Sequence, residues 1–252
     1  MSLLSKYLIE EANAITSTAR NLDDEEVRKA LNLLDNCSKA KLKLIVSGVG
    51  KSGIVARKIA ATFSSVGLTS IYLNPLDALH GDIGIVNERD LCILLSNSGE
   101  TSEILEIIPH LKSRRSSCIA LTANKNSSLS KLCDVFLSTK IEKEICPLNL
   151  APTASTAVSM AIGDALASAW MDRNNISPKE FAFNHPAGSL GRKLTITVND
   201  VMIPRDKFSS LEEESSVIDV IYQMTLNGIG CCWIQESTYD FSLIGIITDG
   251  DL

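Results

Sequence analysis

An alternation of short apolar runs with helical periodicity, beginning after Lys43, constrains the fold of this chain more than any other feature. The apolar runs are LKLIVSG, TSIYLN, DLCILLSNSG, SSCIALT and DVFLST. In the segments between them, apolar residues recur at the spacing of one helical face, as at Val55, Ile59 and Phe63. Strands that alternate with helices are joined by crossover connections, which produce a parallel sheet covered on both faces. The sequence therefore predicts an α/β fold.

The segments on either side of this alternation extend the prediction. Residues 3–39 have apolar positions at helical spacing with a break near residues 21–24, which indicates two helices. Residues 140–152 lack periodicity and contain two prolines, so we expect an irregular loop before a long helix over residues 153–172.

The alternation of apolar runs and helical segments is interrupted near residues 195–201. The pattern beyond it indicates a strand or turn and then a helix and two strands, over the ranges 216–227, 231–235 and 243–248. We therefore predict a first domain over residues 1–195 and a second, incomplete module over residues 196–252.

The amino-acid composition limits which kinds of partner the chain can bind and in which cellular compartment we expect it. The chain has 24 Lys and Arg residues against 30 Asp and Glu residues, a net charge of −6, and no basic run, which argues against binding nucleic acid or an anionic membrane. We expect no membrane-spanning segment and no secretion signal. The seven cysteines form no C-x-x-C pair. They are typical of reduced thiols, and we expect a cytoplasmic protein.

The first apolar run ends in a glycine-rich loop, Ser47-Gly48-Val49-Gly50-Lys51-Ser52-Gly53, that leads into a helix. Glycines let the backbone approach a ligand, and amides at a helix N-terminus favour an anion. A P-loop is excluded because Ile45 occupies the place of its first glycine. A dinucleotide-binding site would need an acidic residue at the end of the second run, and the residue there is Asn74, so this type of site is not supported either. A purely structural turn is the alternative to ligand binding by Ser47, Gly48, Lys51, Ser52 and Asn74.

The third run ends in a second loop, Ser96-Asn97-Ser98-Gly99-Glu100-Thr101, again followed by a helix. Helix capping would need only one of its hydroxyls. Ser96, Asn97, Ser98 and Thr101 are therefore candidate ligands of a phosphate monoester. Ligands of open α/β sheets bind at the carboxyl ends of the strands. We expect a small phosphorylated ligand.

Two carboxylates and two histidines are candidates for proton transfer. The apolar stripe of the helix after the third run consists of Ile104, Ile107, Ile108 and Leu111. Glu106 lies opposite this stripe, whereas Glu103 lies on its flank beside the phosphate loop and is the better candidate. Glu144 lies in the irregular loop, and a solvated charge is the alternative there. His80 and His185 lie in glycine-containing irregular segments, where catalytic and structural roles compete evenly.

Five separated motifs carry a resemblance to a known family. GVGKSG, SNSGETSE, ALHGD, KEICPLNLAPTAST and HPAGSLGRKL resemble the arabinose 5-phosphate isomerases of the sugar isomerase (SIS) domain family. The terminal VNDVMIP and LIGIITDGDL segments resemble the opening of a cystathionine-β-synthase-type (CBS) repeat. The resemblance implies a five-stranded parallel sheet in a flavodoxin-like three-layer sandwich with a partial CBS repeat. It also implies interconversion of D-arabinose 5-phosphate and D-ribulose 5-phosphate, in the branch of lipopolysaccharide biosynthesis that leads to 3-deoxy-D-manno-octulosonate.

The resemblance also assigns residues and partners. It places the functional positions at Lys51, His80, Glu103, Glu144 and His185. It implies chemistry that requires no cofactor and no metal. A family histidine that has been linked to zinc is replaced here by Asn74, and this departure from the family pattern further lowers the case for a metal. It further implies a homotetramer whose sites borrow His80 or His185 from neighbouring subunits, and a nucleotide-type ligand at the CBS repeats. The alternatives are isomerisation of another sugar phosphate or a non-catalytic phosphosugar sensor.

Overall fold

The structure, a computed structural model, describes residues 1–186, 196–204, 207–236 and 242–252. The chain divides into two compact units, Met1–Thr195 and Ile196–Leu252. The predicted domain boundary at residue 195 lies outside the described residues.

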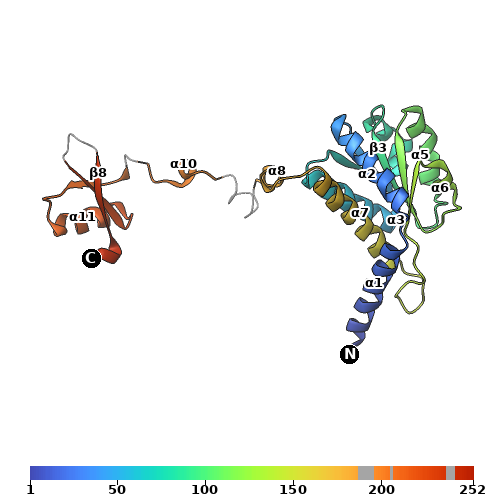
Figure 1. The fold of residues 1–252 in the computed structure, drawn as a ribbon, viewed down its shortest axis with the longest axis horizontal. Coiled ribbons are helices and arrows are strands. Elements are labelled where there is room, and N and C mark those ends of the chain that lie inside the picture. Colours follow the sequence, from blue (N-terminus) through green and yellow to red (C-terminus); the bar gives the residue numbers. More distant parts are fainter. Residues whose placement is uncertain (187–195, 205–206, 237–241) are drawn as a thin grey trace. The chain divides into compact units, whose positions relative to one another are not determined.

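The first unit is built on a five-stranded parallel sheet (Figure 1). Its strands are β1 (Leu44–Gly48), β2 (Ser70–Leu73), β3 (Leu91–Leu95), β4 (Ser117–Thr122) and β5 (Val135–Ser138), in the order β2-β1-β3-β4-β5. All neighbouring pairs are parallel, and Leu44 of β1 pairs with Ser70 on one side and Leu91 on the other. The predicted α/β class and the five-stranded sheet are confirmed.

Helices cover both faces of this sheet because side chains along each strand alternate between two apolar clusters. The helices on one face are α2 (Asp24–Lys39), α3 (Gly50–Ser65) and α7 (Ala154–Arg173), which pack on alternate strand residues such as Leu44 and Val46. The helices on the other face are α4 (Pro75–Leu79), α5 (Ser102–Ser113) and α6 (Ser128–Leu132), which pack on residues such as Ile45. A short 3₁₀ helix, η1 (Asp82–Ile85), follows α4. The result is a three-layer sandwich.

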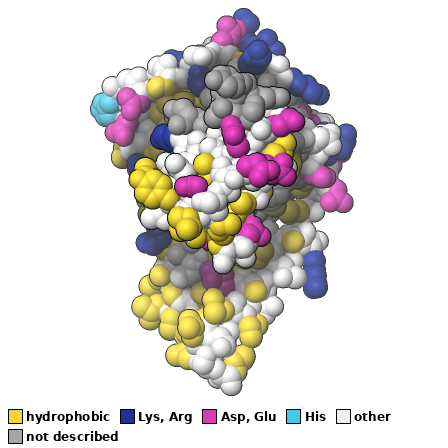
Figure 2. All heavy atoms as spheres, turned by 90° about the vertical axis from the view of Figure 1, so that its left-hand side faces the viewer, with side chains coloured by type: hydrophobic (Ala, Val, Ile, Leu, Met, Phe, Trp, Pro, Cys, Tyr) yellow, Lys and Arg dark blue, Asp and Glu magenta, His cyan; other side chains and the backbone are white. Residues whose placement is uncertain are grey.

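The N-terminal helix α1 (Leu3–Arg20) keeps much of its apolar surface exposed. Leu4, Leu8 and Ile9 are 70%, 58% and 49% exposed. Figure 2 shows hydrophobic side chains gathered at the lower end of the molecule, where Figure 1 places α1. Within the described part of the first unit, the first turns of this helix are therefore left exposed.

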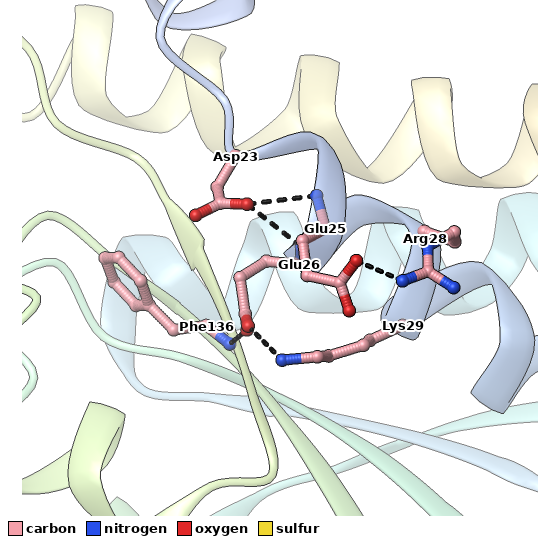
Figure 3. A network of polar contacts seen from close by, with 6 residues as sticks. All are labelled: Asp23, Glu25, Glu26, Arg28, Lys29 and Phe136. Atoms are coloured by element: carbon pink, nitrogen blue, oxygen red, sulfur yellow. Dashed lines mark hydrogen bonds and ion pairs between the residues drawn. The ribbon is translucent and has the colours of Figure 1, made fainter.

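Helix α2 begins at the predicted break and also protects the edge of the sheet. The Asp23 carboxylate accepts hydrogen bonds from the N–H groups of Glu25 and Glu26, at 3.0 and 3.3 Å, and so caps the helix (Figure 3). The Glu26 carboxylate accepts a hydrogen bond from the Phe136 N–H at 2.9 Å and pairs with Lys29. Since β5 is an edge strand, this side chain satisfies a backbone donor that would otherwise invite another strand.

The second unit has a three-stranded sheet with one covering helix. Its elements are α10 (Val198–Val201), β6 (Ser210–Glu212), α11 (Val217–Asn227), β7 (Cys231–Gln235), β8 (Leu243–Thr248) and the 3₁₀ helix η3 (Asp249–Asp251). β6 is parallel to β7, and β8 is antiparallel to β7. The predicted helix and strands are confirmed. The described core is small and consists of Val220, Met224 and Cys232 with Leu211 and Ile247 against them.

Two further observations complete the description. The short helix α8 (Pro178–Phe183) follows α7 and has a capping box at Ser177 and Glu180. In the part of the chain that the structure describes, no helix combines the length and apolar character needed to cross a bilayer.

Candidate functional site

The sheet order creates a switch point between β1 and β3. These strands are neighbours, but the chain leaves them towards opposite faces, through α3 and α5 respectively. Loops at such a point leave a crevice between the carboxyl ends of the strands. A pocket of about 290 Å³ lies here, lined by Val49, Lys51, Ser52, Val55, Asn97, Pro152, Ser155, Thr156 and Ser159. The loops after β1 and β3 therefore meet the N-terminus of α7.

The loop after β1 presents backbone and one cation to this pocket. Gly50 adopts a φ of 59°, and no other atom lies within 4 Å of the place its Cβ would occupy, so the backbone is accessible. Lys51 is exposed in the first turn of α3, and among the described residues it has no ion-pair partner. The free positive charge and the amides of the helix N-terminus favour an anionic ligand.

Other predicted residues of this region are engaged in the fold. Ser47 is fully buried, and its hydroxyl donates to the Leu73 carbonyl at 2.7 Å. A Cβ on Gly53 would lie 2.7 Å from the carbonyl oxygen of Gly48, so this pair of glycines lets α3 pack closely on the end of β1. Asn74 caps α4 by accepting a hydrogen bond from the Leu76 N–H at 3.1 Å. These contacts stabilise the fold, so each of these residues has a structural role whether or not it binds a ligand.

The loop after β3 gathers three hydroxyl groups. The hydroxyls of Ser96 and Thr101 are 2.7 Å apart, and those of Ser96 and Ser98 are 3.5 Å apart. Ser96 is buried and also accepts a hydrogen bond from the Gly99 N–H at 3.0 Å, whereas Ser98 is exposed. Asn97 is exposed and lines the pocket. Hydrogen bonds within the loop hold these hydroxyls in place beside the pocket-lining Asn97.

This loop has a left-handed residue that only glycine fits. Gly99 adopts a φ of 72°, and a Cβ there would lie 2.2 Å from Oγ of Ser127, just before α6. Helix α6 holds the loop further through the Leu129 N–H, which donates to the Gly99 carbonyl at 3.1 Å, and the Ser128 N–H, which donates to the Glu100 carboxylate at 2.8 Å. The hydroxyl cluster therefore rests on the start of α6.

Glu144 lies in the predicted irregular loop and binds the start of α7. Its carboxylate accepts hydrogen bonds from the Thr153 N–H at 2.8 Å, the Thr153 hydroxyl at 3.0 Å and the Ser155 N–H at 3.2 Å, and also from the Ser155 hydroxyl. Burial raises the pKa of Glu144, but these four hydrogen bonds outweigh it and hold the pKa below the ordinary value. An ionised carboxylate is thus fixed beside a pocket-lining serine.

Glu103 lies in the first turn of α5, immediately after the hydroxyl cluster. A hydrogen bond from its own N–H and another from the Ser102 hydroxyl lower the pKa of Glu103. Glu106 is the more exposed of the two glutamates and Glu103 is only partly exposed, in agreement with the predicted helical faces. Glu103 is not among the residues that line the pocket in a single copy.

The two candidate histidines lie apart from Lys51 within one chain. His185 follows α8, stacks on Phe181 with ring centroids 4.1 Å apart, and has Nδ1 2.8 Å from the Phe181 carbonyl oxygen. The preceding Asn184 donates to the carbonyl of Ser65, at the last residue of α3, at 3.4 Å. Since Lys51 is at the first turn of the same helix, a rise of about 1.5 Å per residue separates these ends by about 21 Å.

His80 caps the C-terminus of α4 and is exposed. It lies beyond the carboxyl end of β2 rather than at the switch point, and it is not among the pocket-lining residues. Within the ranges that the structure describes, no group of three or more His, Cys, Asp and Glu side chains is arranged to hold a metal ion.

Sequence reasoning did not identify the contribution of α7 to the pocket. Ser155, Thr156 and Ser159 line it, and the last two are separated by one helical turn. The segment KEICPLNLAPTAST contains the first two of these residues. The polar residues on one face at the start of this Ala-rich helix are the sequence feature that could have predicted its place in the pocket wall.

The switch-point pocket, Lys51, the hydroxyl cluster and the helix N-termini define a class: a three-layer α/β protein whose carboxyl sheet edge has the features that suit a small anionic ligand. The model of the SIS domain family matches residues 37–169. The chain belongs to the SIS domain family.

Known proteins resemble the chain over most of its length. It is 43% identical to an arabinose 5-phosphate isomerase KpsF of Escherichia coli over 97% of this chain and 73% of the relative. It is 39% identical to an arabinose 5-phosphate isomerase KdsD of Francisella tularensis over 92% of this chain and 70% of that relative. A solved structure from Escherichia coli CFT073 in complex with arabinose 5-phosphate has a TM-score of 0.69 and 36% identity, and it covers 73% of this chain and 96% of that one.

Proposed function

We propose that this chain is an aldose–ketose isomerase that interconverts D-arabinose 5-phosphate and D-ribulose 5-phosphate, and so supplies the branch of lipopolysaccharide biosynthesis that leads to 3-deoxy-D-manno-octulosonate. The observation that carries the proposal is the pocket between β1, β3 and α7, with Lys51 in its lining, in a chain that is 43% identical over 97% of its length to a protein named arabinose 5-phosphate isomerase. The arabinose 5-phosphate complex of a relative with 36% identity supports the same substrate.

The phosphate is bound at the carboxyl edge of the sheet in this proposal. Ser96, Ser98 and Thr101 supply hydroxyl donors, and their short mutual distances mean that little order has to be created on binding. Lys51 neutralises the phosphate or a developing oxyanion. Binding energy from this non-reacting end holds the sugar carbons in place for proton transfer.

The reaction moves one proton from C2 to C1, moves another from the C2 oxygen to the C1 oxygen, and shifts one carbonyl double bond. A base removes the C2 proton of the open-chain aldose, the electron pair forms the C1–C2 double bond of an enediolate, and the C1 oxygen becomes anionic. The C1 oxygen then takes up a proton and the C2 hydroxyl gives one up, so that the C2 oxygen becomes the ketone carbonyl as a proton is delivered to C1. Glu103, Glu144 and His185 are the proposed proton-transfer groups, and His80 is proposed for ring opening or a second relay. Glu144 already accepts four hydrogen bonds, which favours an electrostatic role for it over that of the base.

A second copy of the chain would complete this site. His185 lies at the end of α3 remote from Lys51, so its proposed role requires it to come from a neighbouring subunit. The exposed apolar side chains of α1 and an apolar hollow of about 230 Å³ between α1, α2 and α7 favour association. We propose a homotetramer, and gel filtration that finds an active monomer would contradict it.

The second unit is proposed to be a partial CBS repeat, with the boundary between residues 195 and 196. Its β6-α11-β7-β8 order and the LIGIITDGDL segment support this interpretation. In a protein with a pair of repeats, the unit would bind a nucleotide-type ligand. We place the enzyme in the cytoplasm, where free thiols such as those of its seven cysteines persist.

The test of the proposed reaction is turnover of arabinose 5-phosphate by the full chain, followed as ketose formation with and without a chelator. We expect turnover that the chelator does not affect. Folded protein without turnover would refute the isomerase, and loss of turnover with chelator would refute metal-free catalysis. Lys51→Met should raise KM strongly, whereas Lys125→Met, an exposed lysine outside this pocket, should leave KM unchanged.

A further inference from the structure

Three of the seven cysteines lie together in one cluster beneath α6. Cys92 of β3 and Cys118 of β4 are register partners on adjacent strands, so their side chains point to the same face of the sheet. Both are fully buried in the apolar cluster that α5 and α6 cover. Cys133, which directly follows α6, is partly exposed and packs against the same cluster.

Backbone contacts hold Cys118 and Cys133 next to each other. Asp134 donates its N–H to the Cys118 carbonyl at 2.9 Å, and its carboxylate accepts the Cys118 N–H at 2.7 Å. Cys133 directly precedes Asp134 and has an extended backbone conformation. Ile119 pairs with Val135, so Cys118 faces Asp134 and Cys133 lies one residue away from that partner. Steps of about 4.8 Å between strands and about 3.3 Å along the chain place the two Cα atoms about 5.8 Å apart, within the range of about 4.4–6.8 Å that a disulfide spans.

A small molecule can reach this pair from one side. Cys133, Lys131 and Asp134 line an open hollow of about 660 Å³ beside the edge strand β5. Cys92 and Cys118 have no exposed surface of their own. A reagent therefore meets the thiol of Cys133 first, with Cys118 directly behind it.

We propose that Cys118 and Cys133 form a redox pair that a peroxide-class oxidant converts to a disulfide. The Cys133 sulfur attacks one peroxide oxygen, the O–O bond breaks, and the second oxygen leaves as hydroxide, which takes up the Cys133 thiol proton and becomes water. The Cys118 sulfur then attacks the Cys133 sulfenic acid and displaces its hydroxyl, which takes up the Cys118 proton as water. Two thiols are oxidised by two electrons, and one peroxide is reduced to two waters.

The electrostatics of the cluster suit this chemistry. Hydrogen bonds from the thiols of Cys133 and Cys92 lower the pKa of Cys118, although its burial opposes the effect. The hydrogen bond with Cys118 and burial raise the pKa of Cys133. The lowered pKa of Cys118 suits its sulfur to attack a sulfenic acid on Cys133 in the second step.

A disulfide at this position would act on the phosphate loop. Cys133 donates its N–H to the Leu129 carbonyl at 3.1 Å and thus belongs to the end of α6. The start of the same short helix holds Gly99 and Glu100 through the N–H groups of Leu129 and Ser128. Movement of Cys133 towards Cys118 shifts α6 and loosens the hydroxyl cluster, so oxidation should weaken substrate binding.

The experiment treats the full chain with hydrogen peroxide and maps its disulfides by mass spectrometry of non-reduced peptides. We expect a Cys118–Cys133 linkage, loss of two hydrogen atoms from the intact mass, and reversal by dithiothreitol. Cys133→Ser should abolish the linkage and leave basal activity unchanged. Cys146→Ser removes the partly exposed thiol of another loop and should keep the linkage. This readout is independent of the isomerase assay.

The effect on binding, which rests on the proposed function, is measured as KM for arabinose 5-phosphate before and after oxidation. We expect KM to rise about three- to tenfold with kcat little changed, as the weakening of one or two hydrogen bonds would produce. Cys133→Ser should keep a constant KM under peroxide. Oxidation confined to Cys146, or a disulfide that joins other cysteines, would refute the pair. A Cys118–Cys133 disulfide with unchanged KM would refute its coupling to the phosphate loop.

Discussion

The carboxylate of Glu144 accepts a hydrogen bond from the backbone N–H of Thr153 at 2.8 Å, and this contact ties the irregular loop to the start of α7. Thr153 is the N-cap of α7 and forms no side-chain capping bond to its own helix. Glu144, which lies nine residues earlier in the chain, therefore supplies the hydrogen-bond acceptor that the N-terminus of α7 needs. The same interaction holds Ser155 in the wall of the pocket.

Glu144→Gln should destabilise the fold, because an amide replaces part of a charged acceptor for four donors. We expect the free energy of unfolding to fall by about 1–3 kcal/mol. Glu142→Gln removes an exposed charge from the same loop and should change it by less than about 0.5 kcal/mol. Urea denaturation of both variants measures the difference, and equal stabilities would contradict the capping role.

The stability that Glu144 contributes should depend on pH with a defined sign. Its pKa is lowered in the folded protein, so its contribution is complete above the ordinary value of 4.5 and is lost as the pH falls through the folded pKa. The difference in Tm between the wild type and Glu144→Gln should therefore be constant above about pH 5.5 and shrink in more acidic buffer. A difference that stays constant down to about pH 3 would show that the carboxylate is not stabilised by the fold.

Gly99→Ala should weaken phosphate binding. Gly99 has a left-handed φ of 72°, and the new methyl group would meet Ser127, so the loop must shift. We expect KM for the sugar phosphate to rise about tenfold or more, which corresponds to about 1.4 kcal/mol. Gly84→Ala adds a methyl group where no atom lies within 4 Å and should leave KM unchanged. Steady-state kinetics of the two variants decide, and an unchanged KM for Gly99→Ala would argue against a rigid cradle.

Glu103→Gln and Glu106→Gln should differ sharply in activity. Glu103 follows the hydroxyl cluster and is partly shielded, whereas Glu106 is on the exposed face of α5. Loss of a proton-transfer group lowers kcat by about 10²–10⁴-fold, so we expect this effect for Glu103→Gln only. Equal activities would show that the position of Glu103 on the helix does not determine catalysis.

Much of the fold could be predicted because the local pattern and the tertiary structure agree. The stripe that contains Val55, Ile59 and Phe63 is the buried face of α3, and the break before Asp24 is the capped start of α2. Apolar periodicity determines which face a helix buries, and this information is local in the sequence.

The candidate site was less accessible to sequence reasoning, because its geometry depends on contacts between distant segments. The sequence alone does not say that residue 185 lies at the far end of α3 from Lys51, since this depends on where the chain goes after α7. Nor does it say that the Glu144 carboxylate is occupied by the donors of Thr153 and Ser155. Motifs identified the residue types, and the fold determines which of them meet.

The most direct measurement is a crystal structure of the full chain with arabinose 5-phosphate bound. We predict the phosphate on the hydroxyls of Ser96, Ser98 and Thr101, the sugar in the pocket between Lys51 and the start of α7, and the His185 ring of a second copy within reach of the sugar. A ligand bound elsewhere on the protein, or a site completed by His185 of the same copy, would contradict this account.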